Sequence, residues 1–335
     1  MKKLTNKERT TLLIPILIVL VVVLAYLSMN VGFIEISPEN IIKTLLGQGT
    51  EQEMLTMWIV RLPKAAVAII AGLCLAVSGA VMQGVTRNPL ATPSMIGVSA
   101  GSNLGILIAI LLVDKGFGMP IPMPIAAVLG GVLAFMLVYS LAMKYNLSPI
   151  KLILNGIAIN SCLGAITLAL SMRLSEDAYL MRSLFMAGSL SYASWDMVKL
   201  AVIIALPLLI YVMYKAFHLN ILNLNEELAI GLGLNLKKER KKLLYVTVIL
   251  TSVAAYVAGG ISFIGIIAPH ISKRIVGSNF KLFMPLAVLL GIVIVLLADV
   301  LCRITAIHGA DIPIGTLISI IGAPYLLYLL FAQDR

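Results

Sequence analysis

The sequence has little charge for its length. Of its 335 residues, 12% are Asp, Glu, Lys or Arg, whereas 60% are hydrophobic and the mean hydropathy is +1.04. A soluble domain carries roughly 25% charged residues. The charges fall in clusters between apolar runs of roughly 17–25 residues, the length at which a helix crosses the hydrocarbon core of a bilayer. This composition excludes a soluble globular enzyme and predicts an all-α integral membrane protein.

Cysteine is scarce and not arranged for chemistry. Cys74, Cys162 and Cys302 lie in or at the ends of apolar runs, and no C-x-x-C pair occurs. This spacing argues against a disulfide framework or a metal site. We expect packed or lipid-facing thiols and no bound metal.

Several energy-converting motifs are missing. The chain contains no G-x-x-x-x-G-K-[ST], so it does not bind ATP through a P-loop, and it contains no H-E-x-x-H. With Asp299 placed at the end of its span, no acidic residue falls deep inside an apolar run, although such acids are usual in ion-coupled carriers. If the chain transports a solute, we expect the energy to enter from another subunit.

The net charge of +10 does not indicate nucleic-acid binding. Lys and Arg cluster at the ends of apolar runs, where positive charge sets the orientation of membrane helices. No basic stretch is interleaved with aromatic residues. The predicted environment is a lipid bilayer, with no nucleic-acid partner.

Ten spans are predicted if Gly259-Gly260 breaks the apolar stretch 243–280 into two. Both termini then share one side, which holds about two thirds of the 25 Lys and Arg residues and is therefore cytoplasmic. The spans are 12–29, 65–86, 93–113, 122–143, 152–172, 197–217, 243–258, a shorter one ending near Pro269-His270, 282–302 and 313–332.

These spans predict a single polytopic transmembrane domain over residues 1–335. Five spans fall in each of two pseudo-halves, about 1–172 and 196–335, and an odd number per half predicts an inverted repeat, as in many transporters. The segments 31–57 and 173–195, on the side opposite the termini, are predicted to contain short surface helices.

The polar segment 87–93 (R-N-P-L-A-T-P), here called the hinge, separates two apolar spans. Its prolines at positions 89 and 93 hold the preceding residues extended, so one helix ends cleanly before the next begins. One interpretation is a simple helical hairpin turn. The other is a constriction in which Asn88 and Leu90 point into a passage.

Residues 97–101 match G-x-S-x-G, the nucleophile pattern of serine hydrolases. That chemistry requires a strand before Ser99 and a histidine base. The competing interpretation is helix packing, because Gly97, Gly101 and Gly105 recur on one face at four-residue spacing. The surrounding apolar helix favours packing.

The segment 223–242 carries a short helix signal followed by a strongly basic run. Glu226 and Glu227 suit a first helical turn, and Gly231 suits a helix end. Such an amphipathic helix either enters the groove of a partner or lies among lipid headgroups. The residues alone leave both alternatives open.

Three basic residues, Arg61, Lys64 and Arg303, fall on the side opposite the termini, against the usual charge bias. Contact with lipid headgroups is one explanation. Docking of an acidic partner from outside is the other.

Short motifs along nearly the whole chain make it resemble the FecCD/BtuC-like family. This family comprises the permease subunits of bacterial ATP-binding-cassette (ABC) importers for iron–siderophores, haem and cobalamin. The motif residues are Arg61-Leu62-Pro63, Ser78-Gly79-Ala80, Gln83, Arg87-Asn88-Pro89-Leu90-Ala91, Gly97 to Gly101, Leu232-Gly233, Phe263-Ile264-Gly265, Pro269-His270, Ala298-Asp299, Arg303, Pro313-Ile314-Gly315 and Gly322-Ala323-Pro324.

The resemblance implies the ten-helix fold of a type II ABC importer in the bacterial cytoplasmic membrane. It implies a pathway formed with a second permease chain, identical or related, and two cytoplasmic ABC ATPases that use ATP. It also implies an extracytoplasmic substrate-binding protein and no cofactor on the chain itself. An iron–siderophore is the expected cargo, with haem or cobalamin as alternatives. An ion-coupled secondary carrier and an intramembrane serine hydrolase are the rival hypotheses.

By motif, the resemblance implies that Arg61, Lys64 and Arg303 dock the binding protein. Lys64 stands where the family motif R-L-P-R has a second arginine; it keeps the charge but not the bidentate fork. Asn88 and Leu90 are expected to form a cytoplasmic gate.

A second gate element is expected in the turn between the fourth and fifth spans. There, Ser148 is followed by Pro149 and Ile150, which departs from the family's small hydroxyl residues. The helix that couples to the ATPase is expected at residues 226–233. The residues expected to contact the ATPase are Glu226, Glu227, Leu228, Ala229, Gly231, Leu232 and Gly233.

Overall fold

The computed structural model describes residues 5–32, 36–118, 122–143, 149–224 and 226–333, and in these ranges it contains helices and no strand. The elements in chain order are α1 (Asn6–Asn30), α2 (Pro38–Leu45), α3 (Glu51–Leu55), the π-helical turn η1 (Thr56–Arg61), α4 (Leu62–Thr86), the 3-10 turn η2 (Pro93–Ile96), α5 (Val98–Asp114), α6 (Met123–Met143), α7 (Pro149–Ser171), α8 (Glu176–Met186), α9 (Trp195–Tyr214), α10 (Ala216–Leu222), α11 (Glu226–Gly231), α12 (Leu236–Ala258), α13 (Ile264–Val276), α14 (Phe280–Ile307) and α15 (Ile314–Gln333).

The all-helical membrane fold is confirmed. Among the described residues, seven helices are long and apolar enough to cross a bilayer: α1, α4 with the preceding α3 and η1, α6, α7, α9, α12 and α14. The helices α5 and α15 are apolar but shorter. Since α13 has only 13 residues, helix length alone does not establish the predicted count of ten spans.

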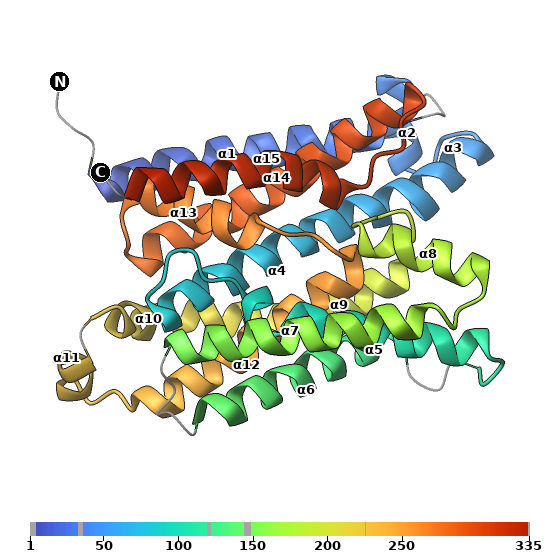
Figure 1. Ribbon diagram of the computed structural model, residues 1–335. Helices are drawn as coiled ribbons and strands as arrows, with labels where there is room; N and C mark the ends of the chain where they lie inside the picture. The colour runs from blue at the N-terminus through green and yellow to red at the C-terminus, as the bar shows by residue number, and fades with distance from the viewer. Residues whose placement is uncertain (1–4, 33–35, 119–121, 144–148, 225, 334–335) are drawn as a thin grey trace.

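The bundle has two distinct ends (Figure 1). The helices α10 and α11 lie at one end, with the start of α1 and the end of α15, and α2, α3 and α8 lie at the other. We call these the α11 end and the α8 end. At the α11 end, Arg9 of α1 donates from Nη1 to the carbonyl of Ile275 in α13 at 3.2 Å. The short surface helices predicted in 31–57 and 173–195 are confirmed as α2, α3 and α8.

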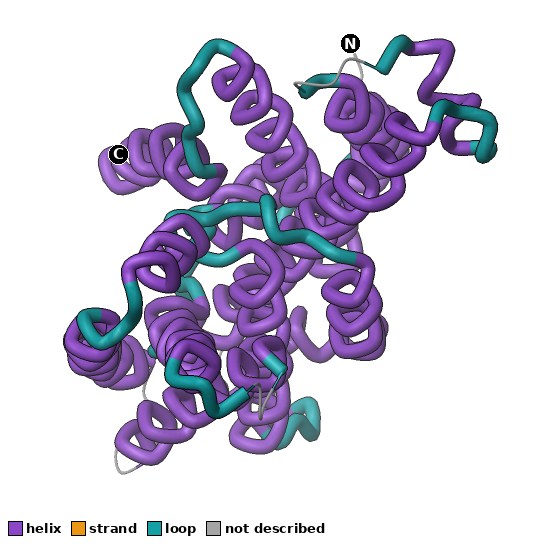
Figure 2. Tube along the Cα trace, turned by 90° about the vertical axis from the view of Figure 1, so that its right-hand side faces the viewer, coloured by secondary structure: helices purple, strands orange, loops and turns teal. Residues whose placement is uncertain are grey.

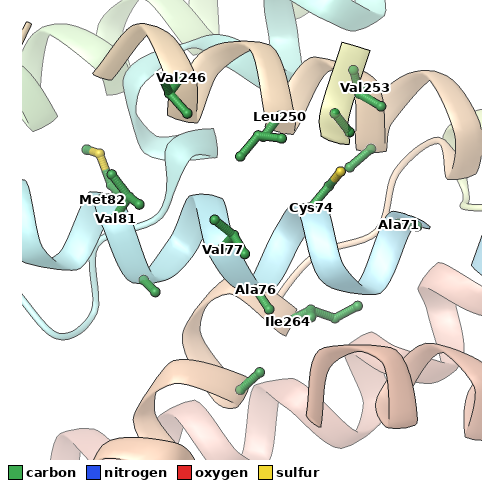
Figure 3. Packing of buried hydrophobic residues seen from close by; sticks show 14 of the residues in the cluster. Ala71, Cys74, Ala76, Val77, Val81, Met82, Val246, Leu250, Val253 and Ile264 are labelled. Carbon is green, nitrogen blue, oxygen red and sulfur yellow. The ribbon is translucent and has the colours of Figure 1, made fainter. Parts of the chain in front are cut away.

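The helix α4 forms the centre of the bundle. Both α4 and α12 are buried over most of their apolar length, whereas α1, α7 and α9 leave most of theirs uncovered. Figure 3 shows Cys74 and Val77 of α4 facing Leu250 of α12, with Ala76 toward Ile264 of α13.

Because α4 packs against α12 and α14, the two predicted pseudo-halves interleave. Figure 2 views the bundle from the α8 end, and connecting loops cross this end. An inverted repeat stays a prediction.

Glycines allow the closest helix contacts. A Cβ on Gly101 of α5 would lie 2.3 Å from the carbonyl oxygen of Gly130 in α6, and one on Gly105 would lie 2.2 Å from that of Ala126. Such approaches exclude a side chain. The packing interpretation of the G-x-S-x-G segment is therefore confirmed.

The predicted break at Gly259-Gly260 is also confirmed. The helix α12 ends at Ala258, and Gly259 takes φ 67° and ψ −137°, a conformation that residues with a Cβ rarely adopt. The backbone N–H of Gly260 donates to the carbonyl of Phe185 in α8 at 3.4 Å. This contact satisfies non-helical backbone inside the protein, as a membrane protein requires.

The end predicted for the following span, near Pro269-His270, is wrong. The helix α13 continues through Pro269 to Val276. Proline lacks the N–H that would bond the carbonyl four residues earlier, which is that of Gly265. The Gln83 amide of α4 donates to this carbonyl at 3.2 Å, and Lys273 donates to Gln83 Oε1 at 2.9 Å. A neighbouring helix thus satisfies the carbonyl, and α13 continues.

Candidate functional site

At the α8 end, two of the three basic residues singled out by the sequence, Lys64 and Arg303, pair with one acid. Arg303 donates from Nε to Asp299 Oδ2 at 2.8 Å, and Lys64 Nζ lies 3.7 Å from Asp299 Oδ1. Ser28 of α1 donates to the same carboxylate at 2.7 Å. We call Arg61, Lys64, Asp299 and Arg303 the charge cluster. It joins α1, α4 and α14.

The placement of Asp299 corrects the expectation that no acid lies inside a span. Its side chain is fully buried, about two turns before the end of α14. A lone carboxylate there would be strongly unfavourable, but Lys64 and Arg303 neutralise it. The paired acid is therefore part of an ionic cluster, unlike the free acids of an ion-coupled carrier.

Arg61 is only 3% exposed. Its guanidinium donates to the carbonyls of Met29 and Asn30, the last residues of α1, the latter at 3.0 Å. A Cβ on Gly32 would lie 3.1 Å from Arg61 Nη2, so the glycine leaves space for this side chain. A cation on terminal carbonyls stabilises the end of a helix. The structure thus places Arg61 against its own chain.

A cavity of about 640 Å³ opens beside the charge cluster, and Lys64, Arg303, Tyr192 and Asp311 are among its lining residues. Arg303 Nη2 is buried and makes no hydrogen bond to any described residue. Its Nε is already held by Asp299. This geometry can receive an anionic group at Arg303. Arg61 also lines the cavity, and docking by Arg61, Lys64 and Arg303 stays a prediction.

At the α11 end, the hinge begins with Arg87 in the left-handed conformation (φ 53°), which ends α4. The side chain of Asn88 accepts a hydrogen bond from the N–H of Leu90 at 2.9 Å, and its carbonyl accepts from Ala91 at 3.2 Å. Local hydrogen bonds therefore account for the turn. Asn88 and Leu90 are half-buried, and their gate role stays a prediction.

The segment after the hinge packs against α7. Asn160 donates from Nδ2 to the carbonyl of Ser94 at 2.7 Å. A Cβ on Gly156 would lie 1.9 Å from the carbonyl oxygen of Met95, so these backbones touch. Any movement of this segment therefore involves α7. The second gate element, at Ser148, lies outside the described residues.

The short helix predicted at 226–233 is confirmed as α11, which packs on α10 and α12. Ala229 is fully buried against its own chain, while Leu228 is 58% and Leu232 is 63% exposed. Glu227 and Gly231 are also exposed, and Gly233 takes φ 81° just after the helix. The helix therefore projects an apolar face away from the bundle.

Sequence reasoning missed two ion pairs at this end, both made by the same acid. Lys215, after α9, lies 3.3 Å from Glu239 of α12, and Lys242 lies 3.7 Å from the same carboxylate. Glu239 is the one acid within the basic run 237–242, and that position was the available signal. In the part of the chain that the structure describes, no cluster of three His, Cys, Asp or Glu side chains is arranged for a metal ion.

The family model of the FecCD transport family matches residues 19–332. The chain belongs to this family. It is 35% identical to the iron(3+)-hydroxamate import system permease protein of Bacillus subtilis, with both chains fully covered. It is 36% identical to the Fe(3+)-citrate import system permease protein of the same organism, covering 100% of this chain and 99% of the other.

Two further comparisons agree with this membership. The chain is 33% identical to the hemin transport system permease protein of Yersinia pestis, covering 98% of each. A solved metal-chelate type ABC transporter in an inward-facing conformation matches with a TM-score of 0.84 and 28% identity, covering 96% of this chain and 99% of that one.

The protein is therefore a membrane transport subunit of an ABC importer, with the ATPase on a separate subunit. The serine-hydrolase and ion-coupled-carrier hypotheses are set aside.

Proposed function

We propose that this permease carries a ferric siderophore across the cytoplasmic membrane, driven by ATPases bound at α11. The observation that carries this proposal is the exposed apolar face of α11. Leu228 on this helix and Leu232 directly after it are each more than half exposed, which matches a helix that enters the groove of a partner. The chain itself has no P-loop, so the nucleotide site belongs to that partner.

The proposed orientation places the α11 end, and with it both termini, in the cytoplasm. The five cations of residues 237–242 follow α11 directly and support this orientation. The α8 end then faces outward, where Lys64 and Arg303 at the cavity receive an acidic group of the extracytoplasmic binding protein. A second permease chain covers the apolar helices that one chain leaves uncovered.

The cargo proposal rests on the relatives. Two of them are named for ferric hydroxamate and ferric citrate, which supports a ferric chelate as the first choice. Hemin is the second candidate, because a similarly distant relative is named for it. Cobalamin stays an untested alternative. Binding of each ligand to the co-purified binding protein distinguishes these cargoes.

Deletion of residues 226–233 tests the proposed coupling. In vesicles containing the complete transporter, we expect the deletion to abolish ATP-driven uptake of a radiolabelled ferric chelate and to release the ATPase. Capture of the binding protein at the opposite end is expected to persist, which shows that the permease is folded. Undiminished uptake by the deletion variant would contradict the proposal.

A further inference from the structure

We propose that Arg87 is a positioning residue that connects the coupling helix α11 to the hinge through α10. This inference rests on the proposed function, in which α11 receives the movement of the ATPase and the hinge gates the pathway. It adds a physical connection between the two. The connection consists of one arginine side chain and the short helix α10.

The first link is a hydrogen bond between Arg87 and α10. Arg87 donates from Nε to the carbonyl of Leu222 at 2.9 Å. Leu222 is the last residue of α10, where carbonyl groups lack helical partners, and a cation there is favourable. Since Leu222 precedes the first residue of α11 by only four positions, a displacement of α11 pulls directly on this carbonyl.

The second link joins α10 to the start of α14. The side-chain oxygen of Asn220 accepts from the N–H of Phe280 at 2.8 Å. Its amide nitrogen donates to the side-chain oxygen of Asn279, the N-cap of α14, at 3.0 Å. Asn220 therefore ties α10 to the start of α14 by two hydrogen bonds.

Close packing makes α10 a stiff connector. Leu219 and Leu222 are both fully buried. A Cβ on Gly84, in the last turn of α4, would lie 2.7 Å from Phe280 Cζ and 3.6 Å from Leu219 Cδ2. Tightly packed side chains transmit a displacement instead of absorbing it. The end of α4, α10 and the start of α14 therefore move together.

The backbone conformation of Arg87 supports a role for its side chain. A helix commonly ends in the left-handed conformation with glycine, because a Cβ is unfavourable there. Arg87 takes φ 53° despite this cost. Its side chain is used for the bond to α10, and Asn88 directly after it holds the turn of the hinge.

The test uses Arg87→Gly, which keeps the turn favourable while removing the guanidinium. Arg87→Lys restores a cation that can reach a carbonyl, and Lys7→Gln removes an exposed cation of α1 away from the hinge. The complete transporter is reconstituted in vesicles. We measure uptake of a radiolabelled ferric chelate, ATP hydrolysis and the amount of assembled complex for each variant.

For Arg87→Gly, we expect assembly and ATP hydrolysis to stay near the unmodified values while chelate uptake per ATP falls at least about five-fold, as the loss of one charge-assisted hydrogen bond predicts. Arg87→Lys is expected to keep part of the uptake per ATP, and the control Lys7→Gln is expected to leave this ratio unchanged. An unchanged ratio in Arg87→Gly would overturn the inference, and so would a loss of uptake that only follows a loss of assembled complex. Deletion of residues 226–233 is run alongside: if it abolishes uptake while Arg87→Gly has no effect, the inference fails and the proposed function stands.

Discussion

The two ends of this permease differ in which side chains they bury and which they expose. At the α8 end, the basic residues that attract attention in the sequence are turned inward: Arg61 binds the end of α1, and Lys64 and Arg303 share the buried Asp299. At the α11 end, apolar residues are turned outward, as in Leu228 and Leu232. At the α8 end most of the charge is paired within the chain, whereas the α11 end exposes apolar side chains that a partner could cover.

This difference separates residues that stabilise the fold from residues that bind another molecule. A buried ion pair is satisfied mainly by its own chain, so it stabilises the α8 end and leaves only the cavity-facing parts of the cluster for another molecule. Exposed leucines on a projecting helix gain stability only when something covers them. We therefore expect substitutions in the charge cluster to affect folding first, and substitutions on α11 to affect association.

The largest effect is expected from Asp299→Asn. Removing the buried acid leaves Lys64 and Arg303 together without a counter-charge, which destabilises a protein by about 3–5 kcal/mol. The matched control is Asp196→Asn, which breaks the exposed pair with Lys199. Thermal unfolding in detergent is expected to show a clear loss of Tm for the first and none for the second. Equal Tm values would show that the charge cluster is not a stabilising feature.

Next in size is a steric change at the α11 end. Gly156→Ala forces a methyl group into the backbone of Met95, and such overpacking costs about 1–3 kcal/mol. Gly164→Ala on the same helix meets nothing within 4 Å and serves as the control. Both variants are compared by Tm and by uptake. A Gly156→Ala variant with wild-type Tm and uptake would show that α7 and the segment after the hinge are not tightly joined.

A smaller effect is expected from Leu228→Gln. Replacing an apolar anchor of an interface with a polar side chain weakens association by about 1–2 kcal/mol, or roughly ten-fold. Leu46→Gln alters a leucine that is 71% exposed at the α8 end and leaves ATPase binding unchanged. Retention of the ATPase by the immobilised permease measures the difference. Equal losses for both variants would remove the distinction between the two ends.

The smallest effect on association is expected from Lys64→Gln, because only part of this side chain reaches the cavity, and Arg303 still pairs with Asp299 in this variant. Association with the binding protein is expected to weaken about two- to five-fold at low salt, and the difference to vanish at high salt. Lys199→Gln, a more exposed cation at the same end, is the control. Equal salt-sensitive losses for both lysines would indicate general attraction and not docking at the cavity.

Much of the fold could be predicted from local sequence signals. Apolar run length predicted the spanning helices, and Gly259-Gly260 predicted a real break. The end of α13 could not be predicted, because Pro269 normally signals a helix end. The residue that compensates, Gln83, is distant in sequence and meets Gly265 only in the folded bundle.

The candidate site also contains features that local sequence predicts and features that depend on residues distant in sequence. The helix α11 was visible because its start and end signals, Glu226, Glu227 and Gly231, are local in sequence. The burial of Asp299 was not visible, since its partners Ser28 and Lys64 lie on other helices. Counting charges by side of the membrane treats a buried cation and a surface cation alike. The bond from Arg87 to a backbone carbonyl leaves no sequence signal at its acceptor.

The central claim is that this chain is a conduit powered by a separate ATPase at its α11 end. The most direct measurement compares vesicles that contain the purified permease alone with vesicles that also contain its ATPase, each supplied with ATP, binding protein and radiolabelled ferric chelate. The account predicts accumulation against a gradient only when the ATPase is present. Accumulation by the permease alone would contradict it.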